Sequence, residues 1–173
     1  MKIPKFFIFV ISTMVLLMGT AAAEEKTAAA CNSLRDCLAN DEFDEQAAKY
    51  FGADKIGMKK YVMAFLKRGP NRPTDQKKRE ELQAAHMKNI ERMAAEGKLV
   101  LAGPFLEDGD LRGIYLFNVK TLAEAEALTN TDPAVKAGSL VMELKEWYGS
   151  AAVMAVNSIH KKLSPKPISK TGN

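Results

Sequence analysis

From residue 59 onward, short apolar runs alternate with apolar faces at helical spacing. Residues 61–66 form an apolar run typical of a strand, which the Gly- and Pro-rich residues 69–73 bring to an end. Thr74 can then cap a long helix that stops before Gly97. One face of this helix carries apolar side chains and a histidine at helical spacing, namely Leu82, Ala85, His86, Ile90 and Met93.

Two further strands are predicted at residues 99–102 and 113–119, because both runs are apolar and breakers separate them. The connection between them consists of a break at Gly103 and Pro104 and a polar turn at residues 107–110. These two strands therefore follow each other directly, without a helix between them.

The rest of the pattern predicts a second helix, a short helical turn and a fourth strand. Thr121 can cap the second helix, and Asp132 before Pro133 can start a turn that Gly138 ends. Residues 139–147 form the last strand. The order is β-α-β-β-α-β, which predicts an α+β fold of the ferredoxin-like kind over residues 59–148.

Three of the four predicted strands are apolar on both faces, as Ile114 and Leu116 against Tyr115 and Phe117 illustrate. Two helices cover only one face of such a sheet, so the other face needs an apolar partner. A second copy is the simplest partner. The sequence thus predicts a homodimer in a dimeric α+β barrel arrangement, with a cleft between sheet and helix in each protomer.

Beyond the last strand, Ser150 can cap an extra C-terminal helix over residues 149–163. Its predicted apolar stripe consists of Ala152, Val156, Ile159 and Leu163. This arm is suited to pack on a partner. Residues 164–173 predict a solvated basic tail, with weak attraction to an anionic membrane surface as the alternative.

The N-terminus has the organisation of a secretory signal peptide over residues 1–23. Lys2 and Lys5 precede the apolar run at residues 6–18, and small residues stand before Glu24. A membrane span needs roughly 20 apolar residues, so an uncleaved anchor is the weaker alternative. We expect a periplasmic or secreted protein without stable membrane insertion.

Residues 24–57 are rich in alanine and acids, and they predict a leader that packs loosely or is partly disordered. Cys31 and Cys37 could form a disulfide after export if a turn lies between them, or they could stay as two unpaired thiols. Neither has a nearby histidine, so no metal site is expected.

The net charge of +4 falls to about +2 once the two signal-peptide lysines are removed, and this argues against a nucleic-acid partner. The sequence shows no phosphate-binding loop, nucleophile elbow or metal-ligand cluster. We therefore expect no cofactor.

Four elements, in this order along the chain, resemble the YciI-like (YCII-related) family over about residues 59–147. They are residues 61–66, His86 in the long helix, residues 96–104 (EGKLVLAGP) and residues 131–138 (TDPAVKAG). The resemblance implies a dimeric ferredoxin-like fold and a histidine–aspartate site at His86 and Asp132. Some members resemble muconolactone isomerases and dehydrochlorinases that act on small ring compounds, which implies proton-transfer chemistry.

The site hypothesis makes His86 the acid/base and Asp132 its orienting partner. Each residue also has a structural interpretation, because His86 lies on an apolar face and Asp132 is well placed as an N-cap. Arg68 could hold an anionic substrate, and Gly103 and Pro104 could line the cleft.

Two functions follow from this hypothesis. The first is a cofactor-independent lyase or isomerase that moves a proton on a small anionic substrate, cyclic compounds included. The alternative is a module that binds a small ligand or an envelope partner without catalysis.

Overall fold

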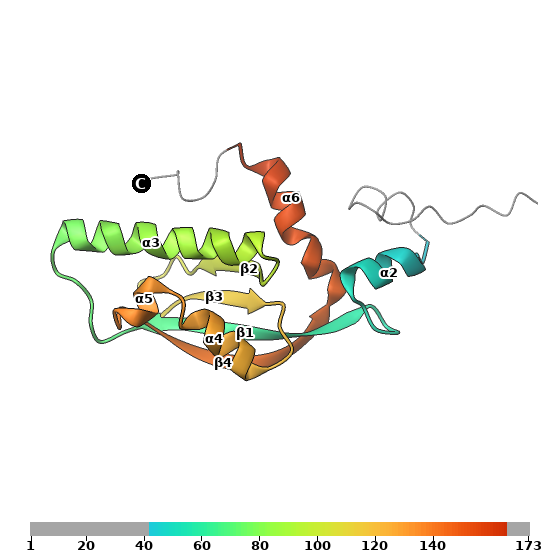
Figure 1. Cartoon of the computed structure of the whole chain (residues 1–173), viewed down its shortest axis with the longest axis horizontal. Helices are drawn as coiled ribbons and strands as arrows, with labels where there is room; N and C mark the ends of the chain where they lie inside the picture. Colours follow the sequence, from blue (N-terminus) through green and yellow to red (C-terminus); the bar gives the residue numbers. More distant parts are fainter. Residues whose placement is uncertain (1–41, 166–173) are drawn as a thin grey trace, which may run out of the picture.

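The computed structural model describes residues 42–165 (Figure 1). Four strands form one antiparallel sheet in the order β2-β3-β1-β4. The chain order β1-α3-β2-β3-α4-α5-β4 with this strand order is the ferredoxin-like fold, so the predicted fold class is confirmed. The elements in chain order are α2 (Glu45–Phe51), β1 (Met58–Arg68), α3 (Gln76–Ala95), β2 (Leu99–Pro104), β3 (Leu111–Phe117), α4 (Leu122–Thr129), α5 (Pro133–Lys136), β4 (Leu140–Ser150), the 3₁₀-helix η1 (Ala151–Ala155) and α6 (Val156–Leu163).

The pairing between β1 and β4 makes both strands longer than their apolar runs suggest. Strand β1 pairs with β4 along its whole length, from Met58 opposite Ser150 to Arg68 opposite Leu140. Each ladder hydrogen bond satisfies a backbone group, whatever the side chain is. Polar residues at the strand ends are therefore included in the sheet.

The first helix of the fold, α3, starts one residue later than predicted. Its N-cap is Asp75 and not Thr74, because the Asp75 carboxylate accepts a hydrogen bond from the Lys78 amide at 2.9 Å. The end agrees with the prediction, since Gly97 follows the helix with a φ of +68° in the left-handed region that glycine tolerates.

The predicted caps of α4 and α5 are both confirmed. Thr121 and Glu124 form a capping box at the start of α4. Asp132 caps α5, with Pro133 in its first turn, and Gly138 follows it with a φ of +69°. These local signals place Asp132 at the point where the chain turns back toward the sheet.

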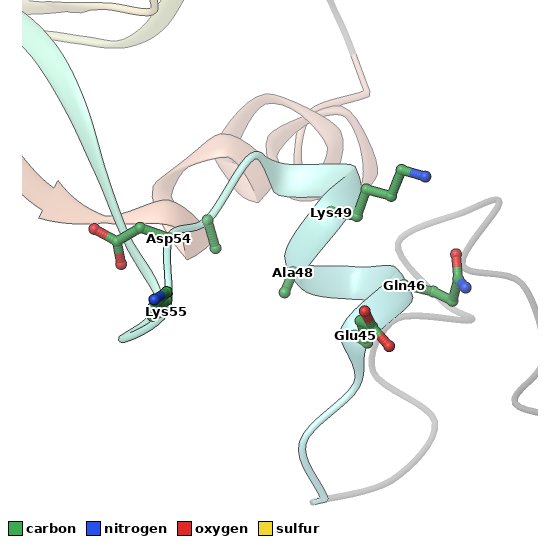
Figure 2. Close-up of a pocket in the computed structure, with 7 residues that line it drawn as sticks. Glu45, Gln46, Ala48, Lys49, Asp54 and Lys55 are labelled. Carbon is green, nitrogen blue, oxygen red and sulfur yellow. The ribbon is translucent and has the colours of Figure 1, made fainter.

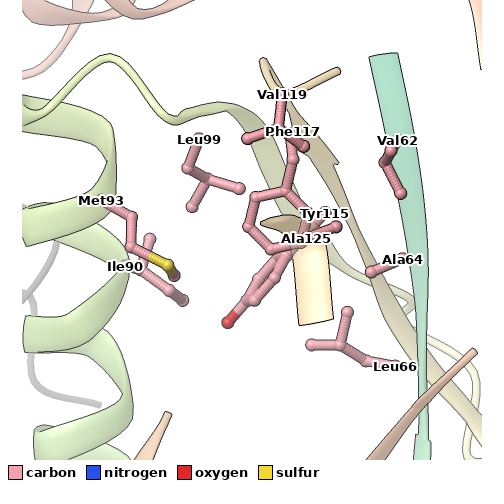
Figure 3. Packing of buried hydrophobic residues seen from close by; sticks show 10 residues of the cluster. All are labelled: Val62, Ala64, Leu66, Ile90, Met93, Leu99, Tyr115, Phe117, Val119 and Ala125. Carbon is pink, nitrogen blue, oxygen red and sulfur yellow. The ribbon is translucent and has the colours of Figure 1, made fainter. Parts of the chain in front are cut away.

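Helices α3 and α4 cover one face of the sheet and enclose the main core (Figure 3). Figure 3 shows Ile90 and Met93 of α3 facing Tyr115 and Phe117 of β3. The remaining buried members of this core are Val62, Ala64, Leu66, Leu99, Val119 and Ala125.

The other face of the sheet is partly covered by the chain's own C-terminal arm. Tyr61, Val100 and Leu116 are buried there, and Val153 and Met154 of η1 pack against them. We call this group the second cluster. Part of the face predicted to need a partner is therefore closed within one chain.

The predicted C-terminal arm is helical, but its first turn is not an α-helix. The Ser150 hydroxyl does cap the arm, since it accepts from the Ala152 amide at 3.2 Å, but the first turn is the 3₁₀-helix η1. A 3₁₀ turn advances with three residues per turn and not 3.6, so it rotates the faces of the α-helix that follows. Ile159 and Leu163 of the predicted stripe are 40% and 75% exposed in the single chain, so their packing on a partner stays a prediction.

The described part of the leader contains a short helix, α2, which the sequence did not predict. Asp44 caps it and Gly52 ends it in the left-handed region, but the helix buries no side chain. The predicted signal peptide, Cys31 and Cys37 lie outside the described residues. Among residues 42–165, no helix is long and apolar enough to span a membrane.

Candidate active site

His86 and Asp132 form a buried pair. His86 comes from the middle of α3 and Asp132 from the cap of α5. The Nδ1 atom of His86 lies 2.8 Å from Oδ2 and 3.0 Å from Oδ1 of Asp132. The Asp132 side chain is fully buried, whereas the His86 side chain keeps 11% of its surface exposed. The predicted proximity of these two residues is therefore confirmed.

Tyr115 of β3 is the third member of the site, and the sequence analysis missed it. Its hydroxyl lies 3.3 Å from Nε2 of His86 and 3.3 Å from Oδ2 of Asp132. Its ring stacks on the imidazole with centroids 6.2 Å apart, and its oxygen points toward α3 in Figure 3. The sequence could have indicated Tyr115, because strand alternation places it on the same buried face as Phe117. A buried tyrosine hydroxyl needs a polar partner.

The environment of Tyr115 keeps its hydroxyl protonated. Burial raises the pKa of Tyr115 far above its ordinary value, and the negative charge of Asp132 and the hydrogen bond to it raise this pKa further. The hydroxyl is therefore a neutral hydrogen-bond donor at any pH near neutrality.

The contacts of Asp132 determine which nitrogen of His86 carries the proton. An ionised carboxylate only accepts hydrogen bonds, so Nδ1 of His86 is the N–H that donates to it. Nε2 then presents a lone pair toward the Tyr115 hydroxyl. Oδ1 of Asp132 also accepts from the Ala134 amide at 2.9 Å, so capping and pairing coexist on one carboxylate.

A polar network anchors the residue before Asp132 to α3. The Thr131 hydroxyl lies 3.1 Å from Oδ1 of Asn89, which is one turn after His86. Nη2 of Arg92 donates to the same Asn89 oxygen and to the Thr131 hydroxyl, at 2.9 Å each. The connection before α5 is thus tied to the helix that carries the histidine.

The far end of α5 is tied to the loop after β1. The Gly69 amide donates to the Ser139 carbonyl at 2.9 Å, and the Asn71 amide donates to the Gly138 carbonyl at 3.0 Å. A Cβ atom at Gly69 would lie only 2.1 Å from the Gly138 carbonyl oxygen. A side chain at position 69 would therefore push this connection out of place.

The three predicted substrate-binding residues lie at the end of the sheet near the β2–β3 hairpin. Nη2 of Arg68 donates to Asp108 at 2.7 Å. Gly103 and Pro104 pair with Ile114 and Gly113 at the edge strand. No described contact joins these three residues to His86 or Asp132, so their role stays a prediction.

Neither of the two described cavities is lined by the histidine site. One, of about 520 Å³, lies beside α2, and Figure 2 shows Glu45, Gln46 and Lys49 along this helix and Asp54 and Lys55 on the segment after it. The other, of about 540 Å³, lies between α3, β2 and α6. Within residues 42–165, no group of three or more His, Cys, Asp or Glu side chains is placed to hold a metal ion.

Comparison with known protein families decides the family of the chain. The model of the YCII-related domain matches residues 63–148, which include His86, Tyr115 and Asp132. The chain belongs to the YCII-related family. Helix α2 and the whole C-terminal arm, with η1 and α6, lie outside the matched YCII-related domain.

This YCII-related chain is similar to two further known proteins. The uncharacterized protein YjpA of Bacillus subtilis (strain 168) is 34% identical over 64 residues, which cover 37% of this chain and 73% of YjpA. A solved structure of 5-chloro-2-hydroxyhydroquinone dehydrochlorinase (TftG) from Burkholderia phenoliruptrix AC1100, in complex with 2,5-dihydroxybenzoquinone, superposes with a TM-score of 0.39 and 23% identity. That match covers 50% of this chain and 92% of the dehydrochlorinase chain.

Proposed function

We propose that this YCII-related protein is a cofactor-independent lyase or isomerase that moves a proton on a small anionic substrate, cyclic compounds included. The observation that carries the proposal is the position of the His86 imidazole between the Asp132 carboxylate and the Tyr115 hydroxyl. An imidazole held in this way can exchange a proton near neutral pH.

In the proposed reaction, Nε2 of His86 takes a proton from a carbon next to a carbonyl group. The imidazolium that forms keeps its Nδ1–H on Asp132, and the buried negative charge stabilises it. Return of the proton at another carbon gives an isomer, and loss of a leaving group instead gives the product of a lyase. Both outcomes need no cofactor.

Tyr115 is suited to stabilise the negative oxygen that develops on such a substrate. Its raised pKa keeps the hydroxyl protonated, so it can donate a hydrogen bond. Its distances of 3.3 Å to His86 and Asp132 are long for O–H···N and O–H···O bonds. We propose that the hydroxyl turns from these partners to the substrate oxygen.

Arg68 is the proposed site for the substrate's anionic group. Its guanidinium is partly exposed and binds the exposed carboxylate of Asp108. A substrate carboxylate can replace this partner because both present the same planar pair of oxygens to arginine. Gly103 and Pro104 would then border the same side of the substrate.

The test measures proton removal directly, because this step is common to the isomerase and the lyase reaction. The protein is incubated in D₂O with a panel of small cyclic ketones and unsaturated lactones that carry a carboxylate. Exchange of protons next to the carbonyl is followed by NMR. We expect catalysed exchange with at least one compound, a loss of about 100-fold or more in His86→Ala, and a smaller loss in Tyr115→Phe.

Asp132→Asn separates catalysis from capping. Asparagine still caps a helix but cannot stabilise an imidazolium, so exchange should fall while the fold is retained. The non-catalytic alternative rests on the full burial of Asp132 and its hydrogen bond to the Ala134 amide. If exchange is absent throughout the panel, or equal in His86→Ala and the unaltered protein, the enzymatic proposal is wrong for these substrates. The result would then favour a module that binds a ligand without catalysis.

A further inference from the structure

The cavity between α3, β2 and α6 has the size of a small-molecule site. Its volume is about 540 Å³, and small-molecule sites in proteins usually occupy roughly 300–1,000 Å³. One of its walls is α6, which lies outside the YCII-related domain. In Figure 1, α6 runs from the end of β4 past the C-terminal end of α3.

Small side chains on two walls keep this cavity open. Ala94 and Ala95 of α3 and Ala102 of β2 line it, and Leu99 and Val100 of β2 lie beneath them as buried residues. A leucine at any of the three alanine positions would place about three more carbon atoms in this space. The walls formed by α3 and β2 are thus mainly apolar, and their small side chains leave space for a ligand.

The α6 wall combines apolar and polar side chains, since Val156 and Asn157 line the cavity together with two basic residues. The basic residues are His160 and Lys161, which line the cavity and remain exposed to solvent, and Ile159 and Leu163 are exposed outside it. The Asn157 side chain holds α6 in this orientation, because its amide donates to the Leu99 carbonyl at 2.7 Å. The wall that α6 supplies therefore includes an imidazole and an ammonium group that stay accessible to water beside the apolar walls.

We infer that this cavity binds a small amphiphilic anion, with an aliphatic or aromatic body against α3 and β2 and a carboxylate at His160 and Lys161. Glu91 is the acidic residue on the walls, and it has an interaction of its own. An unbranched carboxylic acid such as decanoate has an apolar chain suited to these walls and a carboxylate suited to the basic edge. This site is distinct from His86 and does not depend on the proposed function.

The test uses decanoate and its uncharged analogue decanol as probes on the full chain as the cell processes it. Binding is measured by isothermal titration calorimetry. We expect decanoate to bind more tightly than decanol. Lys161→Gln should weaken decanoate about three- to fivefold and leave decanol within twofold, because it removes one partly exposed charge interaction. His160→Gln should act in the same direction.

Two further variants test the location. Lys162→Gln removes a charge from the same turn of α6 that does not line the cavity, so it should leave both affinities unchanged. Ala94→Leu should weaken both probes about tenfold by filling the space. A thermal melt of each variant confirms that it is folded, and Ala102→Val replaces Ala94→Leu if that variant is not.

Several results would overturn the inference. Absence of decanoate binding at millimolar concentration is one. Equal effects of Lys161→Gln and Lys162→Gln on decanoate would show that no carboxylate is bound at the α6 wall. Unchanged binding in a folded cavity-filling variant would place the ligand elsewhere.

Discussion

The carboxylate of Asp132 accepts hydrogen bonds from three elements of the fold. The His86 imidazole reaches it from α3, the Ala134 amide reaches it from α5, and the Tyr115 hydroxyl lies at 3.3 Å. A fully buried carboxylate needs such partners, because an unpaired buried charge is strongly unfavourable. At the residue scale, stability and proposed chemistry therefore depend on the same oxygen atoms.

Removal of this carboxylate should destabilise the fold more than loss of an ordinary cap does. Asp132→Ala removes a cap, which costs about 1 kcal/mol, and leaves the buried His86 without its partner, which costs about 1–3 kcal/mol more. Asp75→Ala at the exposed cap of α3 is the control and should cost only about 1 kcal/mol. Urea unfolding measures both. Equal losses in the two variants would contradict a shared role for Asp132.

Tyr115 should make the fold sensitive to alkali. Burial is the main cause that raises the pKa of Tyr115 in the folded chain above the ordinary tyrosine value of about 10. Below pH 10 the Tyr115 hydroxyl keeps its proton in both the folded and the unfolded chain. Above it, the unfolded chain loses a proton that the folded chain retains, so the free energy of unfolding falls by up to about 1.4 kcal/mol per pH unit.

Tyr115→Phe lacks this proton, so its unfolding free energy should fall less steeply above pH 10 than that of the unaltered protein. Urea unfolding at a series of pH values through this range measures the slope. Tyr50→Phe, at an exposed position, is the matched control. The pKa of Tyr61 is also raised by burial, so part of the slope should remain. Parallel curves for Tyr115→Phe and the unaltered protein would refute the prediction.

At the scale of elements, α5 is the part that completes the site, and it has only one turn. It contributes the Asp132 cap at one end and approaches the loop after β1 at the other, where Gly69 and Gly138 meet. A single turn has little stability of its own, because helix nucleation is unfavourable. Its position therefore depends on these two attachments.

Gly69→Ala should loosen this attachment. The new Cβ would lie 2.1 Å from the Gly138 carbonyl oxygen, so the backbone of one segment must move. We expect a loss of about 1–3 kcal/mol in unfolding free energy and a changed environment of the His86 ring in NMR spectra. Gly109→Ala is the control, since a Cβ there meets nothing within 4 Å. An unchanged His86 signal in a destabilised variant would separate α5 from the site.

At the scale of the whole molecule, the face of the sheet opposite α3 is only partly covered. The arm buries the second cluster, while Phe65 and Ile114 pair across β1 and β3 on the same face and remain partly exposed. Val141 of β4 is 48% exposed beside Lys67. The face left for a partner is therefore smaller than the sequence suggested.

We still predict a homodimer through this face, with a total buried area of order 2,000 Å². Light scattering at low micromolar concentration should report twice the chain mass. Phe65→Glu should give a monomer, because it places a charge in the apolar contact. Leu106→Glu, at an exposed loop position, should leave the dimer intact. A stable monomer of the unaltered protein would show that the arm covers enough of the sheet.

The predicted export of the chain also belongs to this scale. The lysines, the apolar run at residues 6–18 and the alanines before Glu24 should direct removal of residues 1–23. Mass spectrometry of fractionated cells should find a chain that begins near Glu24 outside the cytoplasm. A full-length cytoplasmic chain as the main species would refute this.

The sequence by itself determined the elements whose signals are local. The caps at Thr121 and Asp132, the glycines after α3 and α5 and the apolar runs of the strands each act over a few residues, so the order β-α-β-β-α-β could be predicted. The strand ends could not, because pairing with β4 extended β1 past its apolar run.

The contacts of the site were decided by the tertiary structure. The resemblance to the YCII-related family implied the pair His86 and Asp132, but its partner Tyr115 became visible only when β3 was placed under α3. The faces of α6 depended on the 3₁₀ turn before it, which no apolar spacing revealed. Local hydrogen bonds fix where an element begins and ends, whereas sheet order and packing decide which side chains far apart in the sequence meet.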